Sequence, residues 1–149
     1  MAHKQEASVS SFTRQTITLI LHIMRNLRGS GADMHPEIEL SYPQILMLYV
    51  LLENGTSSMS EVASLLKISH GVATRTADRL VDKRLVDRRH ADTDRRMVLL
   101  SLSKQGKEYA EEMLGNHMEK LNGVFEEVNL QEREGFLTLL ENIDARLEE

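Results

Sequence analysis

Most of the basic side chains of this chain lie in one block of the sequence. Residues 67–107 carry 11 Lys and Arg against 5 Asp and Glu, whereas residues 1–66 carry 4 against 6 and residues 108–149 carry 3 against 12. The formal charge of −5 and the isoelectric point near 5.7 hide this distribution. A basic block between acidic segments is typical of a surface that binds a polyanion.

Side chains that bond phosphates and base edges follow one another at the start of segment 69–84. With helical spacing, one side of this segment consists of Ala73, Ala77, Leu80 and Arg84. The other side begins with hydroxyl, imidazole and guanidinium groups near a helix N-terminus, which suit contact with nucleic acid. Asp78 and Asp82 lie further along that side, where we expect them to fall away from DNA. The candidate DNA contacts of the segment are Ser69, His70, Thr74, Arg75 and Arg79.

The pattern becomes strand-like after this segment. Residues 85–89 and 97–102 are short strand-like runs, and the polar tetrapeptide at 91–94 is expected to form the turn between them. An Arg at the tip of such a hairpin suits insertion into a narrow minor groove. Because consecutive strand residues point to opposite sides, we expect Arg95 to enter the groove while Arg96 and Asp94 hold the tip in shape. Both arginines belong to the candidate DNA-binding set.

Capping signals divide the chain before this block into helices. Residues 12–27 carry a broad apolar stripe at helical spacing, and residues 28–37, with two Gly, one Ser and one Pro, are expected to form a linker. Ser41 is expected to cap a helix that ends at Asn54-Gly55. Ser58 and Glu61 have the spacing of a capping box and open a short helix before the one that Ser69 caps.

Two helices are expected after the hairpin. Ser103 is expected to cap a long one, and Asn129 with Glu132 forms a capping pair before the last. The last helix has an apolar face that consists of Phe136, Leu140, Ile143 and Leu147. The apolar faces of the first and last helices are wider than a small domain covers by itself, so we expect obligate dimerisation through residues 8–30 and 108–149.

The order of three helices followed by a basic hairpin is that of a winged helix-turn-helix. We predict a mainly α fold with a small β-hairpin wing, a single chain 1–149 in which residues 40–107 form the DNA-binding region next to the dimerisation helices. A helix fits the major groove of B-DNA, and a hairpin reaches along the backbone to the neighbouring minor groove. The alternative is a winged helix that binds protein and not DNA. Binding to DNA should weaken steeply with salt, whereas an apolar protein interface should not.

From Leu40 to about Glu112 the sequence resembles the MarR family of bacterial and archaeal transcription regulators. The matching stretches are LSYPQILMLYVLLENG, SMSEVASLLKISHGVATRTADRLVDKRLVDRR and DTDRRMVLLSLSKQGKE. The most specific piece consists of Asp94-Arg95-Arg96, then Leu102-Ser103, then Gln105-Gly106. The resemblance implies a homodimer with interlocked terminal helices that binds a pseudo-palindromic operator, usually as a repressor relieved by a small ligand.

The resemblance also implies roles for single residues. It places DNA contacts at Thr74, Arg75 and Arg95, with Asp94 and Arg96 bracing the wing tip. Three positions depart from the family pattern. Arg84 stands where the family commonly has Gly, and a left-handed helix end costs more for Arg than for Gly. Ser103 replaces the usual Thr, which an N-cap tolerates, and Gly71 leaves bare backbone where the recognition helix begins.

Other chemistry finds little support in the sequence. The chain has no Cys, which excludes disulfides, thiolate nucleophiles and Cys-ligated zinc. It contains no phosphate-binding loop, no nucleophile elbow and no dinucleotide fingerprint. None of the six His forms an i, i+4 pair. We therefore expect no enzymatic activity, no cofactor and no metal site.

The expected partners are double-stranded DNA, a second copy of the chain, and a small aromatic or amphipathic effector. By analogy with the family, His22, Arg25 and Tyr42 are candidate polar groups for the effector. No apolar run approaches the roughly 18 residues of a membrane span. The N-terminal MAHKQEASVSS lacks the apolar core of a signal peptide. We expect a cytoplasmic protein with no membrane partner.

Overall fold

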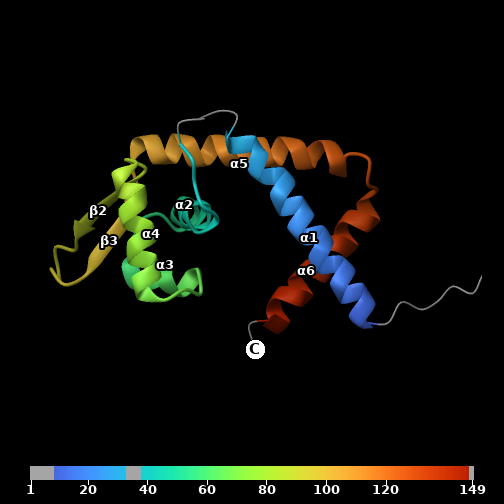
Figure 1. Cartoon of the computed structure of the whole chain (residues 1–149), viewed down its shortest axis with the longest axis horizontal. Helices are drawn as coiled ribbons and strands as arrows, with labels where there is room; N and C mark the ends of the chain where they lie inside the picture. The colour runs from blue at the N-terminus through green and yellow to red at the C-terminus, as the bar shows by residue number, and fades with distance from the viewer. Residues whose placement is uncertain (1–8, 33–37, 148–149) are drawn as a thin grey trace, which may run out of the picture. The chain divides into compact units, whose positions relative to one another are not determined.

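The computed structural model describes residues 9–32 and 38–147. The elements in chain order are α1 (Val9–Ala32), α2 (Tyr42–Asn54), β1 (Ser57–Ser58), α3 (Met59–Leu65), α4 (His70–Asp82), β2 (Val86–His90), β3 (Val98–Leu102), α5 (Lys104–Phe125) and α6 (Leu130–Leu147) (Figure 1). The chain forms two compact units, one ending at Met113 and the other beginning at Leu114. The predicted fold class, mainly helical with a small β wing, is confirmed.

One apolar core lies in the first unit, where α2, α3, α4, the sheet and the start of α5 meet. Its largest fully buried side chains are Met47, Leu48, Leu51, Leu80, Leu85, Leu100, Val62 and Val86. Ala73 and Ala77 of α4 are also fully buried, which confirms the inward side predicted for that segment. Arg84 is the exception, because α4 ends at Asp82 and Arg84 is exposed beyond it.

The predicted capping residues begin the helices as expected. The backbone N–H of Glu61 donates to Ser58 Oγ at 3.2 Å, and the backbone N–H of Ser58 donates to Glu61 Oε2 at 2.7 Å. The backbone N–H of Ser58, followed by the Ser58 hydroxyl, holds the pKa of the Glu61 carboxyl below its usual value. Ser69 Oγ accepts from the backbone N–H of Val72 at 3.4 Å, at the start of α4. The local sequence therefore sets the register of both helices of the helix-turn-helix.

The sheet has one strand more than the predicted hairpin. Its order is β1-β3-β2 and both pairings are antiparallel, with Arg88 opposite Leu100 in one pair and Ser57 opposite Leu100 in the other. The expectation of a two-stranded hairpin is corrected in this respect. β1 has only two residues, too few to show an alternating pattern in the sequence. It joins the start of α3 to the middle of β3, at Leu99 and Leu100.

The expected linker at 28–37 is also partly wrong, because α1 continues to Ala32. Gly lowers helix propensity by about 1 kcal/mol per residue without forbidding helical backbone, so Gly29 and Gly31 continue α1. The remaining linker residues, 33–37, lie outside the described part of the chain. Among the described residues, no helix is long and apolar enough to cross a membrane.

The second unit contains the end of α5 and all of α6. The backbone N–H of Glu132 donates to Asn129 Oδ1 at 3.0 Å, which confirms the predicted cap of α6. The rings of Phe125 and Phe136 lie 6.0 Å apart between centroids, one from each helix. No residue of α6 is buried within this chain, and its predicted apolar face is exposed along its length.

Candidate nucleic-acid interface

The exposed face of α4 carries the candidate residues that the sequence placed there. Ser69, His70, Arg75 and Arg79 are exposed, and Thr74 is half-buried. Thr74 Oγ1 donates to the carbonyl of His70 at 2.9 Å, which leaves the oxygen free to accept a further hydrogen bond. Arg75 Nε donates to the carbonyl of Gly71 at 3.3 Å, which lays the guanidinium back along the first turn.

Gly71 leaves the first turn of α4 without a side chain at that position. A Cβ built at this position meets no heavy atom within 4 Å, so the fold itself does not require Gly there. The bare backbone leaves the first turn of α4 accessible between His70 and Arg75. The exposed donor groups of α4 include one guanidinium at Arg75, a second at Arg79 and the imidazole of His70.

The wing tip is shaped by Asp94. Its Oδ1 accepts from the backbone N–H of Arg96 at 2.9 Å, and its carbonyl accepts from the N–H of Met97, also at 2.9 Å. The N–H of Ala91 donates to the carbonyl of Met97 at 2.9 Å and closes the loop. Asp94 thus holds the turn through backbone groups, as a short Asx-type turn does.

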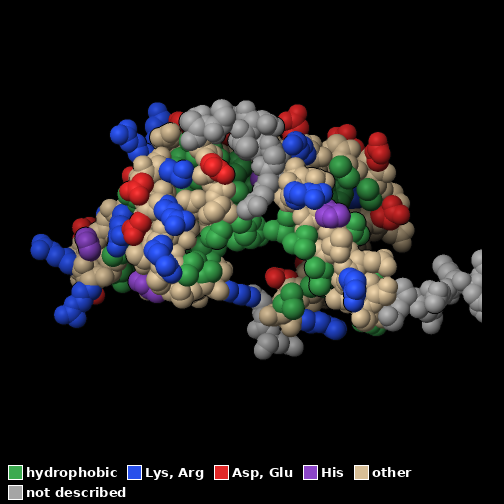
Figure 2. Space-filling model, viewed as in Figure 1, with side chains coloured by type: hydrophobic (Ala, Val, Ile, Leu, Met, Phe, Trp, Pro, Cys, Tyr) green, Lys and Arg blue, Asp and Glu red, His purple; other side chains and the backbone are tan. Residues whose placement is uncertain are grey.

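The strand argument for the two tip arginines is wrong. Arg95 and Arg96 lie in the loop, and β3 begins only at Val98, so strand alternation does not send them to opposite sides. Both side chains are exposed. The N–H that Asp94 receives from Arg96 belongs to the backbone, so the Arg96 guanidinium is not what holds the turn. Figure 2 shows Lys and Arg side chains projecting from the end of the wing.

The base of the wing is fixed by a residue that serves two elements. Ser103 Oγ accepts from the N–H of Gly106 at 2.9 Å and so caps α5, and the same hydroxyl donates to the carbonyl of Arg84 at 2.6 Å. Arg84 takes the left-handed backbone expected at this helix end, with φ of 59°, despite its side chain. The N–H of Ser103 also donates to the carbonyl of Leu85 at 3.1 Å.

Gly106 is required at this junction because the backbone of Leu85 passes close to it, which the sequence analysis did not predict. A Cβ at Gly106 would lie 1.8 Å from the carbonyl oxygen of Leu85, so the first turn of α5 and the start of the wing touch backbone to backbone. The signal was present in the Gln105-Gly106 pair, because Gly is unfavourable inside a helix unless something passes close by.

One ion pair joins the wing to α4. Arg88 Nη1 lies 2.8 Å from Asp78 Oδ1, with the two side chains 38% and 50% exposed. The sequence places Asp78 on the outward side of α4 and gives no partner for it. Its pairing with Arg88 could not be predicted from the sequence, because it depends on the angle between a helix and a strand.

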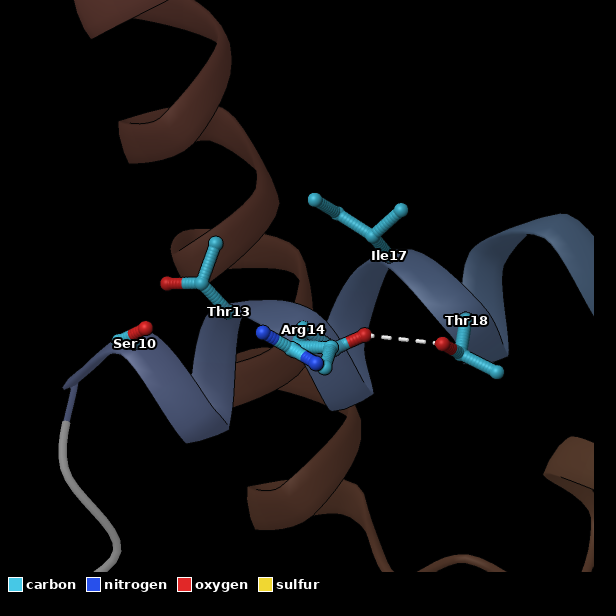
Figure 3. Close-up of a pocket in the computed structure, with 5 residues that line it drawn as sticks. All are labelled: Ser10, Thr13, Arg14, Ile17 and Thr18. Atoms are coloured by element: carbon cyan, nitrogen blue, oxygen red, sulfur yellow. Dashed lines mark hydrogen bonds between the residues drawn. The ribbon is translucent and has the colours of Figure 1, made fainter.

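The candidate effector residues do not line the hollow that the described part of the chain forms on α1. His22 and Arg25 are exposed on α1, and Tyr42 is 40% exposed at the start of α2. A shallow hollow of about 400 Å³ lies elsewhere on α1, lined by Ser10, Thr13, Arg14, Ile17 and Thr18 (Figure 3). No group of three or more acidic or His side chains that suits a metal ion occurs within the described ranges.

The winged-helix region resembles known proteins in sequence, and nearly the whole chain resembles solved structures in fold. The model of the MarR family matches residues 38–97. The transcriptional repressor YetL of Bacillus subtilis is 29% identical over 104 residues, which span 70% of this chain and 62% of YetL. Across the first three curated relatives the match covers between 46% and 68% of their length.

Two solved structures extend the likeness to the terminal helices. RV1404 from Mycobacterium tuberculosis has a TM-score of 0.77 and 25% identity, with 97% of each chain covered. A mutant of MarR from E. coli, complexed with operator DNA, has a TM-score of 0.69 at 19% identity, covering 91% of this chain and 98% of that one, and it shows the shared fold. The family model thus identifies residues 38–97 as similar to the MarR family of transcriptional regulators, and the solved structures extend the shared fold to the terminal helices.

Proposed function

We propose that this chain acts as a homodimer that binds double-stranded DNA at a pseudo-palindromic operator and represses transcription. The observation that carries the proposal is the exposed donor face of α4 beside a wing whose tip presents Arg95 and Arg96. A helix of this kind fits the major groove, and a basic hairpin reaches the minor groove next to it. Repressor function is supported by YetL, which carries that name.

The proposed DNA contacts divide between the two elements. On α4 they are Ser69, His70, Thr74, Arg75 and Arg79, and on the wing they are Arg95 and Arg96. Arg75 is proposed to contact a base edge, because a guanidinium forms two hydrogen bonds with guanine. Its bond to the Gly71 carbonyl uses Nε, which leaves the terminal nitrogens for DNA. Asp94 is proposed to keep the wing tip in shape.

We propose that residues 8–30 and 108–149 form the dimer and residues 40–107 the DNA-binding region. Support comes from the described apolar side chains of α1 and α6, which are exposed within one chain. Examples are Phe12, Ile20, Leu140 and Ile143, between 42% and 60% exposed. Monomeric proteins rarely leave such contiguous apolar surface in water, and two-fold symmetry is the usual way to cover it.

Regulation by a small aromatic or amphipathic effector is a further part of the proposal. It rests on the family, and His22, Arg25 and Tyr42 stay candidate polar groups for such a ligand. We further propose that the chain has no enzymatic activity and works in the cytoplasm, where a transcriptional regulator meets its operator. Support for both comes from the relatives, which are named as transcriptional regulators.

Selection of bound sequences from random duplex DNA with the purified protein tests the proposal. The expected result is a two-fold related sequence with half-site centres about 10 bp apart. Affinity for that sequence should fall steeply as salt rises, since several phosphates are neutralised. A chain that enriches no sequence and binds duplexes without salt dependence would support the alternative, a winged helix that binds protein.

A further inference from the structure

The outer part of β2 makes few contacts with the core. In β2 only Val86 is buried, and the four residues from Asp87 to His90 are exposed. The base is fixed by backbone bonds, from the N–H of Leu85 to the carbonyl of Leu80 at 2.9 Å and from the N–H of Ser103 to the carbonyl of Leu85. Beyond this base β2 places no further side chain in the core, whereas β3 packs on the core through Leu100 and Val98 and also pairs with β1. The outer part of β2 is therefore held by its pairing with β3 and by any side chain that joins it to α4.

The ion pair between Asp78 and Arg88 lies at this point. Asp78 is on the exposed side of α4, and Arg88 is two residues beyond the last buried position of β2. The Arg88 Nη1 to Asp78 Oδ1 distance of 2.8 Å satisfies both a hydrogen bond and an ion pair. The pair thus joins the body of the recognition helix to the strand that leads to the wing tip.

The charges themselves make this pair unexpected on a DNA-binding face. An acid at Asp78 lies on the same helix as Arg75 and Arg79 and opposes the approach of a polyanion. Arg88 neutralises it, but an Arg88 held by Asp78 is not free to neutralise a phosphate. The pair therefore removes one cation from those available to bind phosphates. What the pair can contribute to DNA binding is the orientation of the wing.

We propose that Asp78 and Arg88 are positioning residues, which set the orientation of the wing relative to α4 so that both elements contact one duplex. The proposal rests on the proposed DNA-binding function. Exposed ion pairs contribute little to global stability, so the variants should fold. Their effect should appear in local opening of the wing and in operator affinity, because a wing free to move must be ordered when DNA binds.

The first experiment measures amide hydrogen exchange in the free protein and needs no DNA. Asp78→Asn should speed exchange of the wing amides in residues 87–90 and 98–100 about three- to tenfold, with the melting temperature unchanged. Asp82→Asn is the matched control, because Asp82 is exposed one turn further along α4 and makes no ion pair among the described residues. It should leave wing exchange as in the wild type.

The second experiment exploits the sign of the charge. Removal of an acid near DNA ordinarily strengthens binding, and Asp82→Asn should leave operator affinity unchanged or raise it. Asp78→Asn should instead weaken operator binding about three- to tenfold and reduce the ratio of operator to random-duplex affinity. Arg88→Gln and the double variant should lose the same factor as Asp78→Asn, since each breaks the same link.

The outcomes separate this proposal from the proposed function. Tighter operator binding by Asp78→Asn, with wing exchange unchanged, would overturn the positioning role. Losses that add in the double variant would also overturn it, because the two residues then act separately. If the wild type binds no duplex DNA, the proposed function fails, and the exchange experiment still decides whether the pair holds the wing.

Discussion

Two regions of this chain place their apolar side chains in opposite ways. Between Met47 and Met113 they fill a core, and Met47, Leu48 and Leu80 are fully buried. In α1 and α6 they face outward, and α6 has no buried residue at all. Both regions are helical with ordinary apolar content, so the difference lies in whether the chain itself supplies a covering surface.

The difference separates a region whose apolar side chains the chain covers itself from a region that, in our proposal, a second copy covers. The winged-helix region has cap bonds at each helix start and a core shared by all of its elements. α1 and α6 leave wide apolar faces that cost free energy in water. The comparison therefore predicts that changes in the first region act on folding and DNA contact, and that changes in the second act on assembly.

The largest effect is expected from a charge placed on the exposed face of α6. Leu140→Glu should dissociate the proposed dimer, because the carboxylate would have to be desolvated in an apolar interface. Sedimentation at micromolar concentration should give twice the 17.0 kDa chain mass for the wild type and the chain mass for the variant. Operator affinity should fall by about 10²-fold or more, since the two half-sites are no longer linked.

Leu65→Glu is the matched control for this prediction. Leu65 is 53% exposed at the end of α3, in the winged-helix region, and Leu140 is 44% exposed. The same substitution at Leu65 should leave the sedimentation mass at the dimer value. If the wild type sediments as a monomer, the exposed faces of α1 and α6 do not form a dimer. Changes in these two helices would then not act on assembly.

A pair of glycines in α5 tests the boundary between the two regions. Gly106→Ala should destabilise the fold by about 1–3 kcal/mol or more, because its Cβ would overlap the Leu85 carbonyl and α5 must shift. Gly115→Ala has no heavy atom within 4 Å of its Cβ and should stabilise the helix by up to about 1 kcal/mol. Thermal and denaturant unfolding measure both. An equal loss at Gly115 would mean that this part of α5 is packed in the dimer.

Local signals in the sequence were enough for most of the first region. The capping pair Ser58–Glu61 and the cap Ser69 predicted where α3 and α4 begin, and short strand-like runs located β2 and β3. The inward alanines of α4 followed from helical spacing. These features depend on neighbours within about four residues, which a single sequence displays.

Features that depend on distant approach were not predictable. β1 forms because Ser57 and Ser58 pair with the edge of β3 that β2 does not occupy. The close approach of Gly106 to the Leu85 carbonyl depends on the direction in which α5 continues from β3. The Asp78–Arg88 pair joins residues ten positions apart on different elements. The tip arginines were misplaced onto a strand because the turn is longer than the tetrapeptide suggested.

A smaller effect is expected when one arginine is removed from either region. Arg75→Ala should cost about 1–3 kcal/mol of operator binding and relax base preference at one position per half-site, if it contacts a guanine edge. Arg146→Ala removes the same charge from α6 and should leave base preference unchanged. Binding to a panel of operators with single base changes measures this. Uniform weakening across the panel would instead make Arg75 a phosphate contact.

The smallest effect is expected at the wing tip, where contact with DNA is made by side chains outside any core. Arg95→Ala should weaken specific and non-specific binding alike and flatten the plot of log affinity against log salt by about one to two units per dimer, since two wings each lose a cation. Arg96→Ala should keep the conformation of the loop, because Asp94 bonds the backbone of residue 96 and not its guanidinium.

Asp94→Ala should loosen the tip without removing a cation, and so lower operator affinity with little change in the slope of log affinity against log salt. Operator affinity at four or five salt concentrations separates the three variants. Wild-type slope and affinity in both arginine variants would show that the wing does not touch DNA. The winged helix would then differ from α1 and α6 only because its apolar side chains are covered within the chain.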